Sequence, residues 1–207
     1  MTHFAQHERH ALCDLFLHVG PGAPTLCEGW TAADLAAHLV IRERRPDAAP
    51  GMALPPLAAY TERVQRATRD KGRWEDLVAR VRGGPPPWLR PLDEIVNTVE
   101  FFVHHEDVRR AAEGWEARDL EPGMEAVLWA RLKRTGRLLG RKSPTGLSLD
   151  APGFGTATVK TGGPRVTVRG APGELVLMMF GRGAASNVDF EGDQISVERV
   201  RHARLGL

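Results

Sequence analysis

Cysteine is scarce in this chain, which has only Cys13 and Cys27 in 207 residues. Two cysteines are too few for the disulfide framework of a small secreted protein, and they fit a reducing compartment. Long hydrophobic runs are missing as well, because stretches such as residues 175–180 fall far short of the roughly 20 apolar residues that cross a bilayer. The opening segment MTHFAQHERH lacks the apolar core of a signal peptide. We therefore expect a cytoplasmic protein that does not enter a membrane.

A strong excess of either charge is also absent. Lys and Arg together number 28 against 26 for Asp and Glu, which leaves a formal net charge of +2. Nucleic-acid-binding proteins usually carry a clustered basic excess, so we expect no nucleic-acid partner. The hydrophobic content of 42% and the charged content of 26% are ordinary for a globular protein. Composition leaves the oligomeric state open.

Helical periodicity dominates the first two thirds of the sequence. Thr31 followed by Asp34 predicts a capping box at the start of one helix, and Pro46 ends that helix. A later helix offers Ile95 and Val96, among other apolar side chains, for packing. The helices expected from these patterns cover residues 3–18, 31–45, 57–69, 74–81, 92–112 and 122–139.

The pattern changes beyond Gly140. Short alternating runs at 147–149, 156–159, 166–168 and 187–190 predict strands, and residues 174–180 predict one short apolar helix. The expected fold class is therefore α+β, with a helical domain over residues 1–140 and a small α+β domain over residues 141–207.

The most informative feature is a polar stripe on the expected helix at 92–112. Asn97, Glu100, His104 and Asp107 occupy positions i, i+3, i+7 and i+10, so they share one helical face. The neighbouring residues are apolar and should be buried. A buried carboxylate or imidazole needs a partner, so this face is expected to pair with groups from another helix.

A divalent cation is one such partner. Glu100 and His104 lie one helical turn apart and can share a metal ion, as similar pairs do in helix bundles. The best third ligand is His38, because the small residues Ala36 and Ala37 beside it allow a close approach. Two histidines and one glutamate form the ligand set of catalytic zinc sites that keep an open position. The same set suits nickel, iron or manganese.

Simpler interpretations remain open for these residues. Glu100 and His104 also fit a local helical salt bridge worth roughly 0.2–0.5 kcal/mol, with His38 an ordinary packed histidine. The segment at 7–10, His-Glu-Arg-His, has the wrong spacing for a zinc motif and is expected to be a solvated helix face. Cys13 and Cys27 have no activating context and are expected to be small buried residues.

Two segments resemble a known family. LCEGWTAADLAAHLV at 26–40 and NTVEFFVHHEDVRRA at 97–111 look like the metal-binding N-terminal domain of the mycothiol-dependent maleylpyruvate isomerase family, and in particular an uncharacterised actinobacterial branch of it. That domain belongs to the DinB-like superfamily of four-helix metal-binding bundles. The positions that carry the resemblance are Leu26, Cys27, Gly29, Trp30, Asp34, Leu35, His38, Glu100, His104 and Asp107.

The resemblance implies a ligand set, a cofactor and a second domain. By this likeness His38, Glu100 and His104 bind Zn²⁺ or another divalent ion such as Ni²⁺, and Asp107 supports the site or accepts a proton in catalysis. The partners would be mycothiol, a low-molecular-weight thiol activated by the metal, and a small electrophilic substrate. The remaining chain resembles a small sterol-carrier-like C-terminal domain. Asp34 is better assigned to the helix cap than to the site.

Two functions are compatible with these features. The first is a metal- and thiol-dependent transferase or isomerase acting on small electrophiles. The alternative is a non-catalytic metal-binding or small-ligand-binding module, in which Asp107 or Cys27 closes the site as a fourth ligand. The Pro-rich segments at 46–56 and 85–91 supply no carboxylate-binding cluster, so the substrate is left open, and Arg182 is a weak candidate for contacting it.

Overall fold

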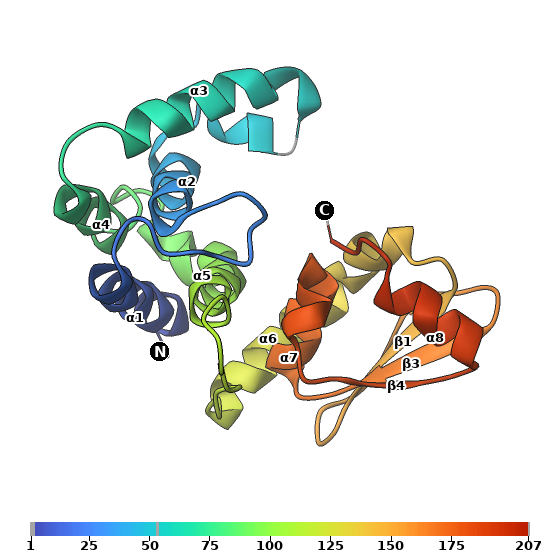
Figure 1. The fold of residues 1–207 in the computed structure, drawn as a ribbon. Helices are drawn as coiled ribbons and strands as arrows, with labels where there is room; N and C mark the ends of the chain where they lie inside the picture. Colours follow the sequence, from blue (N-terminus) through green and yellow to red (C-terminus); the bar gives the residue numbers. More distant parts are fainter. Residues whose placement is uncertain (1–2, 53, 207) are drawn as a thin grey trace. The chain divides into compact units, whose positions relative to one another are not determined.

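The computed structural model describes residues 3–52 and 54–206 (Figure 1). The chain divides into two compact units, the first ending at Trp115 and the second beginning at Glu116. The first unit is helical and the second combines helices with a four-stranded sheet, which confirms the expected α+β class. In the described residues, no helix is both long and apolar enough to span a membrane.

The first unit contains the helices that the periodicity predicts. They are α1 (Phe4–Val19), α2 (Ala32–Arg44), α3 (Ala58–Arg69), α4 (Trp74–Arg82) and α5 (Asp93–Arg109). Apolar side chains of α1, α2, α4 and α5 share one core, and α3 packs against α2. The capping box is confirmed, because Thr31 Oγ1 accepts from the Asp34 backbone N–H and the Asp34 carboxylate accepts from the Thr31 N–H. Asp34 therefore belongs to the cap at the start of α2.

The second unit packs helices on a small mixed sheet. Its elements are α6 (Pro122–Leu139), β1 (Gly146–Ala151), β2 (Gly155–Lys160), β3 (Arg165–Arg169), α7 (Pro172–Leu177), β4 (Asp189–Glu191) and α8 (Gln194–Arg201). The strand order is β2-β1-β3-β4, with β1 antiparallel to β2 and parallel to β3. The helix α8 was not expected from the sequence, since its short segment is largely polar and only Val200 among its apolar residues is fully buried.

The division between the units differs from the boundary expected near residue 140. Helix α6 packs against α7 and β2, and the Trp129 indole N–H donates to the Phe154 carbonyl at 2.9 Å. The helix therefore belongs with the sheet. The sequence pattern changes near residue 140 because α6 ends there, whereas the second compact unit already begins at Glu116.

One expectation for α1 is wrong, because two of its charged residues are buried. Arg9 is only 1% exposed, and its guanidinium donates two 2.7 Å hydrogen bonds to Glu43 and one of 2.8 Å to Asp93. Glu8 is paired with His105 at 2.7 Å. Residues 7–10 therefore do not form one solvated face. The close packing of α1 on α5 buries Glu8 and Arg9, and each of these charged groups has a hydrogen-bond partner.

The first turn of α5 also departs from the expected packing. Ile95 and Val96 are 56% and 52% exposed, whereas Asn97 and Thr98 in the next turn are buried. Charged and polar partners from α1 and α2 occupy the buried side of this turn, so its apolar side chains face outward.

Replacing the buried guanidinium should strongly destabilise the first unit. We expect Arg9→Met to lower the free energy of unfolding by about 3–5 kcal/mol, because Glu43 and Asp93 would keep their charges without a buried counter-ion. Denaturant unfolding measures this loss. The control is Arg82→Met, which removes an ion pair to the exposed Asp14 and should cost about 0–1 kcal/mol. Equal small losses in the two variants would contradict the assigned role of Arg9.

Candidate metal centre

The structure brings the three expected ligands together on two adjacent helices. His38 comes from α2, and Glu100 and His104 come from successive turns of α5. Glu100 Oε1 lies 3.4 Å from His38 Nε2 and 3.2 Å from His104 Nε2. One ligand atom from each residue lies within 4.8 Å of the others, and the side chains are only 10–21% exposed. They form a largely buried cluster of two imidazoles and one carboxylate.

The spacing of these atoms fits a divalent cation. In tetrahedral zinc sites with bonds of about 2.0–2.1 Å, neighbouring ligand atoms are separated by about 3.3–3.5 Å. The two distances to Glu100 Oε1 are close to that separation. The longer one exceeds the usual 2.9–3.0 Å of an N–H···O hydrogen bond. The donor set and its geometry therefore fit zinc or a similar ion.

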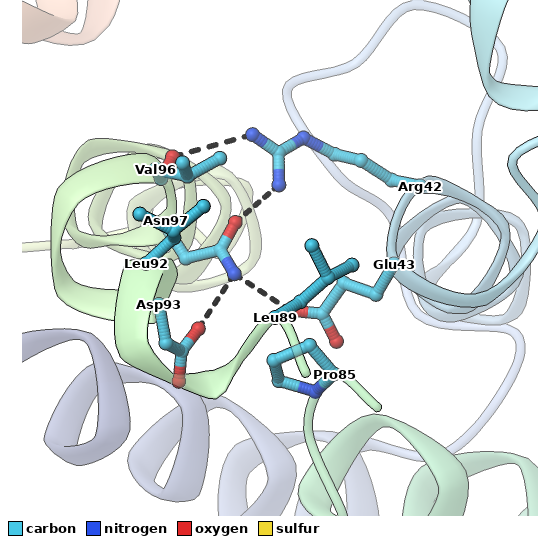
Figure 2. A pocket seen from close by; sticks show the side chains of 8 residues that line it. All are labelled: Arg42, Glu43, Pro85, Leu89, Leu92, Asp93, Val96 and Asn97. Carbon is cyan, nitrogen blue, oxygen red and sulfur yellow. Dashed lines mark hydrogen bonds between the residues drawn. The ribbon is translucent and has the colours of Figure 1, made fainter. Parts of the chain in front are cut away.

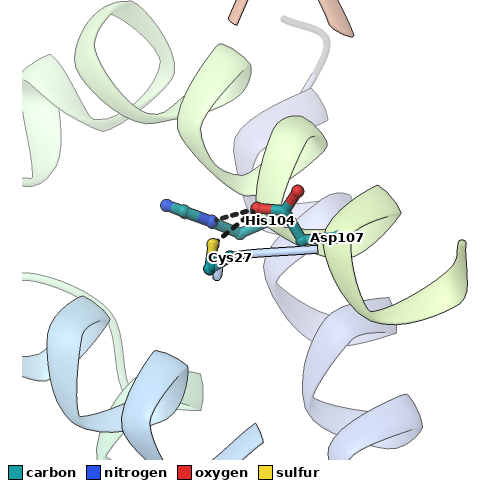
Figure 3. Close-up of side chains that lie close together, drawn as sticks. All are labelled: Cys27, His104 and Asp107. Atoms are coloured by element: carbon teal, nitrogen blue, oxygen red, sulfur yellow. Dashed lines mark hydrogen bonds and ion pairs between the residues drawn. The ribbon is translucent and has the colours of Figure 1, made fainter. Parts of the chain in front are cut away.

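A second contact orients the imidazole of His104 (Figure 3). His104 Nδ1 donates to Asp107 Oδ2 at 2.8 Å, one turn further along α5. This bond fixes the tautomer and directs Nε2 toward Glu100 and His38, as carboxylate–histidine pairs do beside metal ions. Cys27 Sγ also donates to Asp107 Oδ2, at 3.2 Å. Cys27, His104 and Asp107 form a second close group on the opposite edge of the ring.

Two residues at the centre had no role assigned to them from the sequence. Arg42 lies one turn after His38 on α2, and its Nε is 3.1 Å from Glu100 Oε1. Trp30 packs against His38 with ring centroids 5.1 Å apart. The i, i+4 spacing of His38 and Arg42 was the available signal for Arg42. The position of Trp30 depends on a loop whose conformation no periodicity describes.

The remaining residue of the stripe, Asn97, points into a different network (Figure 2). Its side-chain amide donates to Glu43 at 2.9 Å and to Asp93 at 2.6 Å, and its carbonyl oxygen accepts from Arg42. These groups line a small cavity of about 80 Å³ with apolar side chains on its other walls. Arg42 thus contacts both the cavity and the carboxylate of Glu100.

Burial and pairing shift the pKa values of the three ligands in different directions. For His38, burial lowers the pKa below its ordinary value. Burial acts to raise the pKa of Glu100, but hydrogen bonds with His104 and His38 hold it well below its ordinary value. Burial acts to lower the pKa of His104, but bonds with Asp107, Cys27 and Glu100 raise it well above its ordinary value. Without metal at neutral pH, His104 is charged, Glu100 is ionised and His38 is neutral.

The two cysteines differ in their surroundings. Cys13 is buried in the core of the first unit, as expected, and burial raises the pKa of its thiol to about 12. Cys27 is half-buried beside Asp107 rather than enclosed in the core. In the second unit, Arg182 donates to the Phe180 carbonyl at 2.6 Å, and a role for it in a substrate site stays a prediction.

Comparison with known proteins shows what this fold resembles. No family model matches the sequence, and no curated protein matches it. The crystal structure of the mycothiol-dependent maleylpyruvate isomerase superposes with a TM-score of 0.57 at 19% identity, covering 91% of this chain and 90% of that one. A histidine-to-alanine mutant of that isomerase gives 0.56 at 18% identity with the same coverage. The chain therefore shares the isomerase fold, and this likeness alone assigns no activity.

Zinc binding should release about one proton per chain at pH 7, because His104 must lose its Nε2 proton to become a ligand. His38 is already neutral and Glu100 already ionised, so they contribute little. The apparent zinc affinity should rise by up to about tenfold per pH unit until the pH passes the raised pKa of His104. Calorimetry in buffers of different ionisation enthalpy counts the protons.

Asp107→Asn supplies the comparison for this measurement. The substitution removes a negative charge that raises the pKa of His104, so fewer protons should leave at pH 7. Release of no proton by the wild type, or equal release by both proteins, would contradict the ligand assignment of His104.

Proposed function

We propose that the protein is a zinc-dependent enzyme that uses a low-molecular-weight thiol of the mycothiol type to transfer or isomerise small electrophilic compounds. The observation that carries the proposal is the convergence of His38 Nε2 and His104 Nε2 on one oxygen of Glu100 at 3.4 and 3.2 Å. The shared fold of the mycothiol-dependent isomerase supports it. Nickel or another divalent ion would suit the same ligands.

Each residue has a defined task in this proposal. His38, Glu100 and His104 hold the cation, and Asp107 keeps the Nδ1–H of His104 in place. A divalent ion bound here would lower the pKa of a thiol and so provide a thiolate nucleophile near neutral pH. The indole of Trp30 covers one side of His38 and limits the access of water to that ligand. The protein's main tasks are to bind the cation, to orient its ligands and to shield them from water.

The position of Cys27 and Asp107 favours an enzyme over a closed structural site. Asp107 accepts from His104 Nδ1 and the Cys27 thiol lies beside the same carboxylate oxygen, whereas the cation set uses the Nε2 edge of the ring. Neither side chain is placed to complete the coordination around Glu100 Oε1. Three protein ligands would then leave one position for the thiol, as catalytic zinc sites leave one for water or substrate.

The finer architecture belongs to the same proposal. We assign the helical unit to the DinB-like four-helix bundles, and the shared core of α1, α2, α4 and α5 supports this assignment. We assign the second unit to the sterol-carrier-like domains, and its helices packed on a mixed four-stranded sheet agree with that. Within the family, we propose that this chain belongs to the actinobacterial metal-binding branch named in the sequence analysis.

Turnover with metal and thiol tests the proposed function. Zinc-loaded protein should consume a small electrophile such as a maleyl compound only when a low-molecular-weight thiol is added, and His104→Ala should lower this rate by at least about 100-fold. The control is His202→Ala, because His202 is a surface histidine whose side chain is 82% exposed. It should leave the rate unchanged.

The alternative predicts a different result. A non-catalytic metal-binding module would retain one tightly bound zinc ion per chain and show no thiol-dependent turnover with any electrophile tested. Equal rates for the wild type and His104→Ala would likewise contradict an enzyme that works through this centre.

A further inference from the structure

The loop before α2 contacts both histidines of the candidate metal centre. The Cys27 thiol contacts Asp107, which is the hydrogen-bond partner of His104, and the Trp30 ring packs against His38 at a tilted angle. The loop is also fastened to the end of α5, because the Leu26 backbone N–H donates to the Asp107 carbonyl at 2.9 Å. One loop thus contacts Asp107, which orients His104, and also the imidazole of His38.

Internal hydrogen bonds hold this loop in shape. The Thr25 hydroxyl donates to the Trp30 carbonyl at 2.9 Å and accepts from the Cys27 N–H at 3.2 Å, and the Trp30 N–H donates to the Cys27 carbonyl at 2.9 Å. Gly29 adopts a φ of +76°, which suits glycine and allows the tight turn. These hydrogen bonds fix the backbone of Cys27 and so hold its thiol beside Asp107.

Asp107 Oδ2 receives two hydrogen bonds, one from His104 Nδ1 and one from Cys27 Sγ. The Asp107 side chain is fully buried, so the orientation of its carboxylate depends on such contacts. Loss of the S–H donor would leave the carboxylate with one fewer bond to hold its plane, and the imidazole of His104 turns with that plane. Groups that orient a ligating histidine typically change metal affinity by about 10–100-fold when removed.

We propose that Cys27 is a positioning residue of the metal centre, whose thiol holds Asp107 and thereby directs His104 Nε2 at the cation. This inference rests on the proposed metal-binding function. Cys27 acts through Asp107 and does not coordinate the cation, because its sulfur lies at the Nδ1 edge of His104 while the ligand set converges on the Nε2 edge.

Zinc affinity of Cys27 variants tests the proposal, measured by competition with a chromophoric chelator. Cys27→Ala removes the donor and should weaken zinc binding by about tenfold. Cys27→Ser keeps a hydroxyl donor at the same place and should recover most of that loss. In an Asp107→Ala background, Cys27→Ala should have a much smaller effect, because the carboxylate through which it mainly acts is gone and only its contact with His104 remains.

A core variant separates positioning from general destabilisation. Cys13→Ala removes the other thiol from the core of the first unit, where Cys13 Sγ contacts the Val78 carbonyl at 3.8 Å. It should lower the thermal midpoint of the metal-free protein without changing zinc affinity. A purely structural role of Cys27 would make Cys27→Ala behave in the same way.

Four results would overturn the inference. Unchanged zinc affinity in Cys27→Ala would overturn it while leaving the proposed function intact, and so would equal effects of Cys27→Ala with and without Asp107. A thiolate-to-cobalt charge-transfer band in the Co²⁺-substituted protein would show that Cys27 is itself a ligand. Failure of the wild type to bind zinc would overturn the proposed function and this inference with it.

Discussion

Helix α5 buries a charged face, and the first unit is organised around the need to pair those charges. Transfer of a lone carboxylate or imidazolium from water to a protein interior is costly unless a partner accompanies it. Near the start of α5, Asp93 accepts a hydrogen bond from Arg9 of α1. Asn97 donates to Asp93 and to Glu43 of α2. One to three turns later, Glu100, His104 and Asp107 meet His38 and Cys27. The candidate metal centre is one section of this face.

The same constraint would allow the candidate centre to exchange a proton for a metal ion. His104 lies between the carboxylates of Glu100 and Asp107, and these two negative charges favour a positive charge at the ring. Arg42 supplies further positive charge to Glu100 in the metal-free protein. A divalent ion satisfies the carboxylate of Glu100 as well as these groups do, and with a geometry that the two histidines already provide.

Sequence reasoning succeeded where regular helices decide the geometry. The spacing of Glu100, His104 and Asp107 along one helix predicted their common face, and Thr31 with Asp34 predicted the start of α2. It could not place groups that depend on tertiary packing. The burial of Arg9 follows from how α1 lies on α5, and the contact of Cys27 with Asp107 follows from a glycine-containing loop. The domain boundary was misplaced for a similar reason, since the packing of α6 on the sheet leaves no mark in helical periodicity.

The central claim is that one cation is held jointly by His38, Glu100 and His104, and anomalous diffraction tests it most directly. Crystals soaked in zinc and measured at the zinc absorption edge should show a peak about 2.0–2.2 Å from the Nε2 atoms of both histidines and from a carboxylate oxygen of Glu100. A peak at Cys27 and the Nδ1 edge of His104, or no peak on either edge of that ring, would contradict the account.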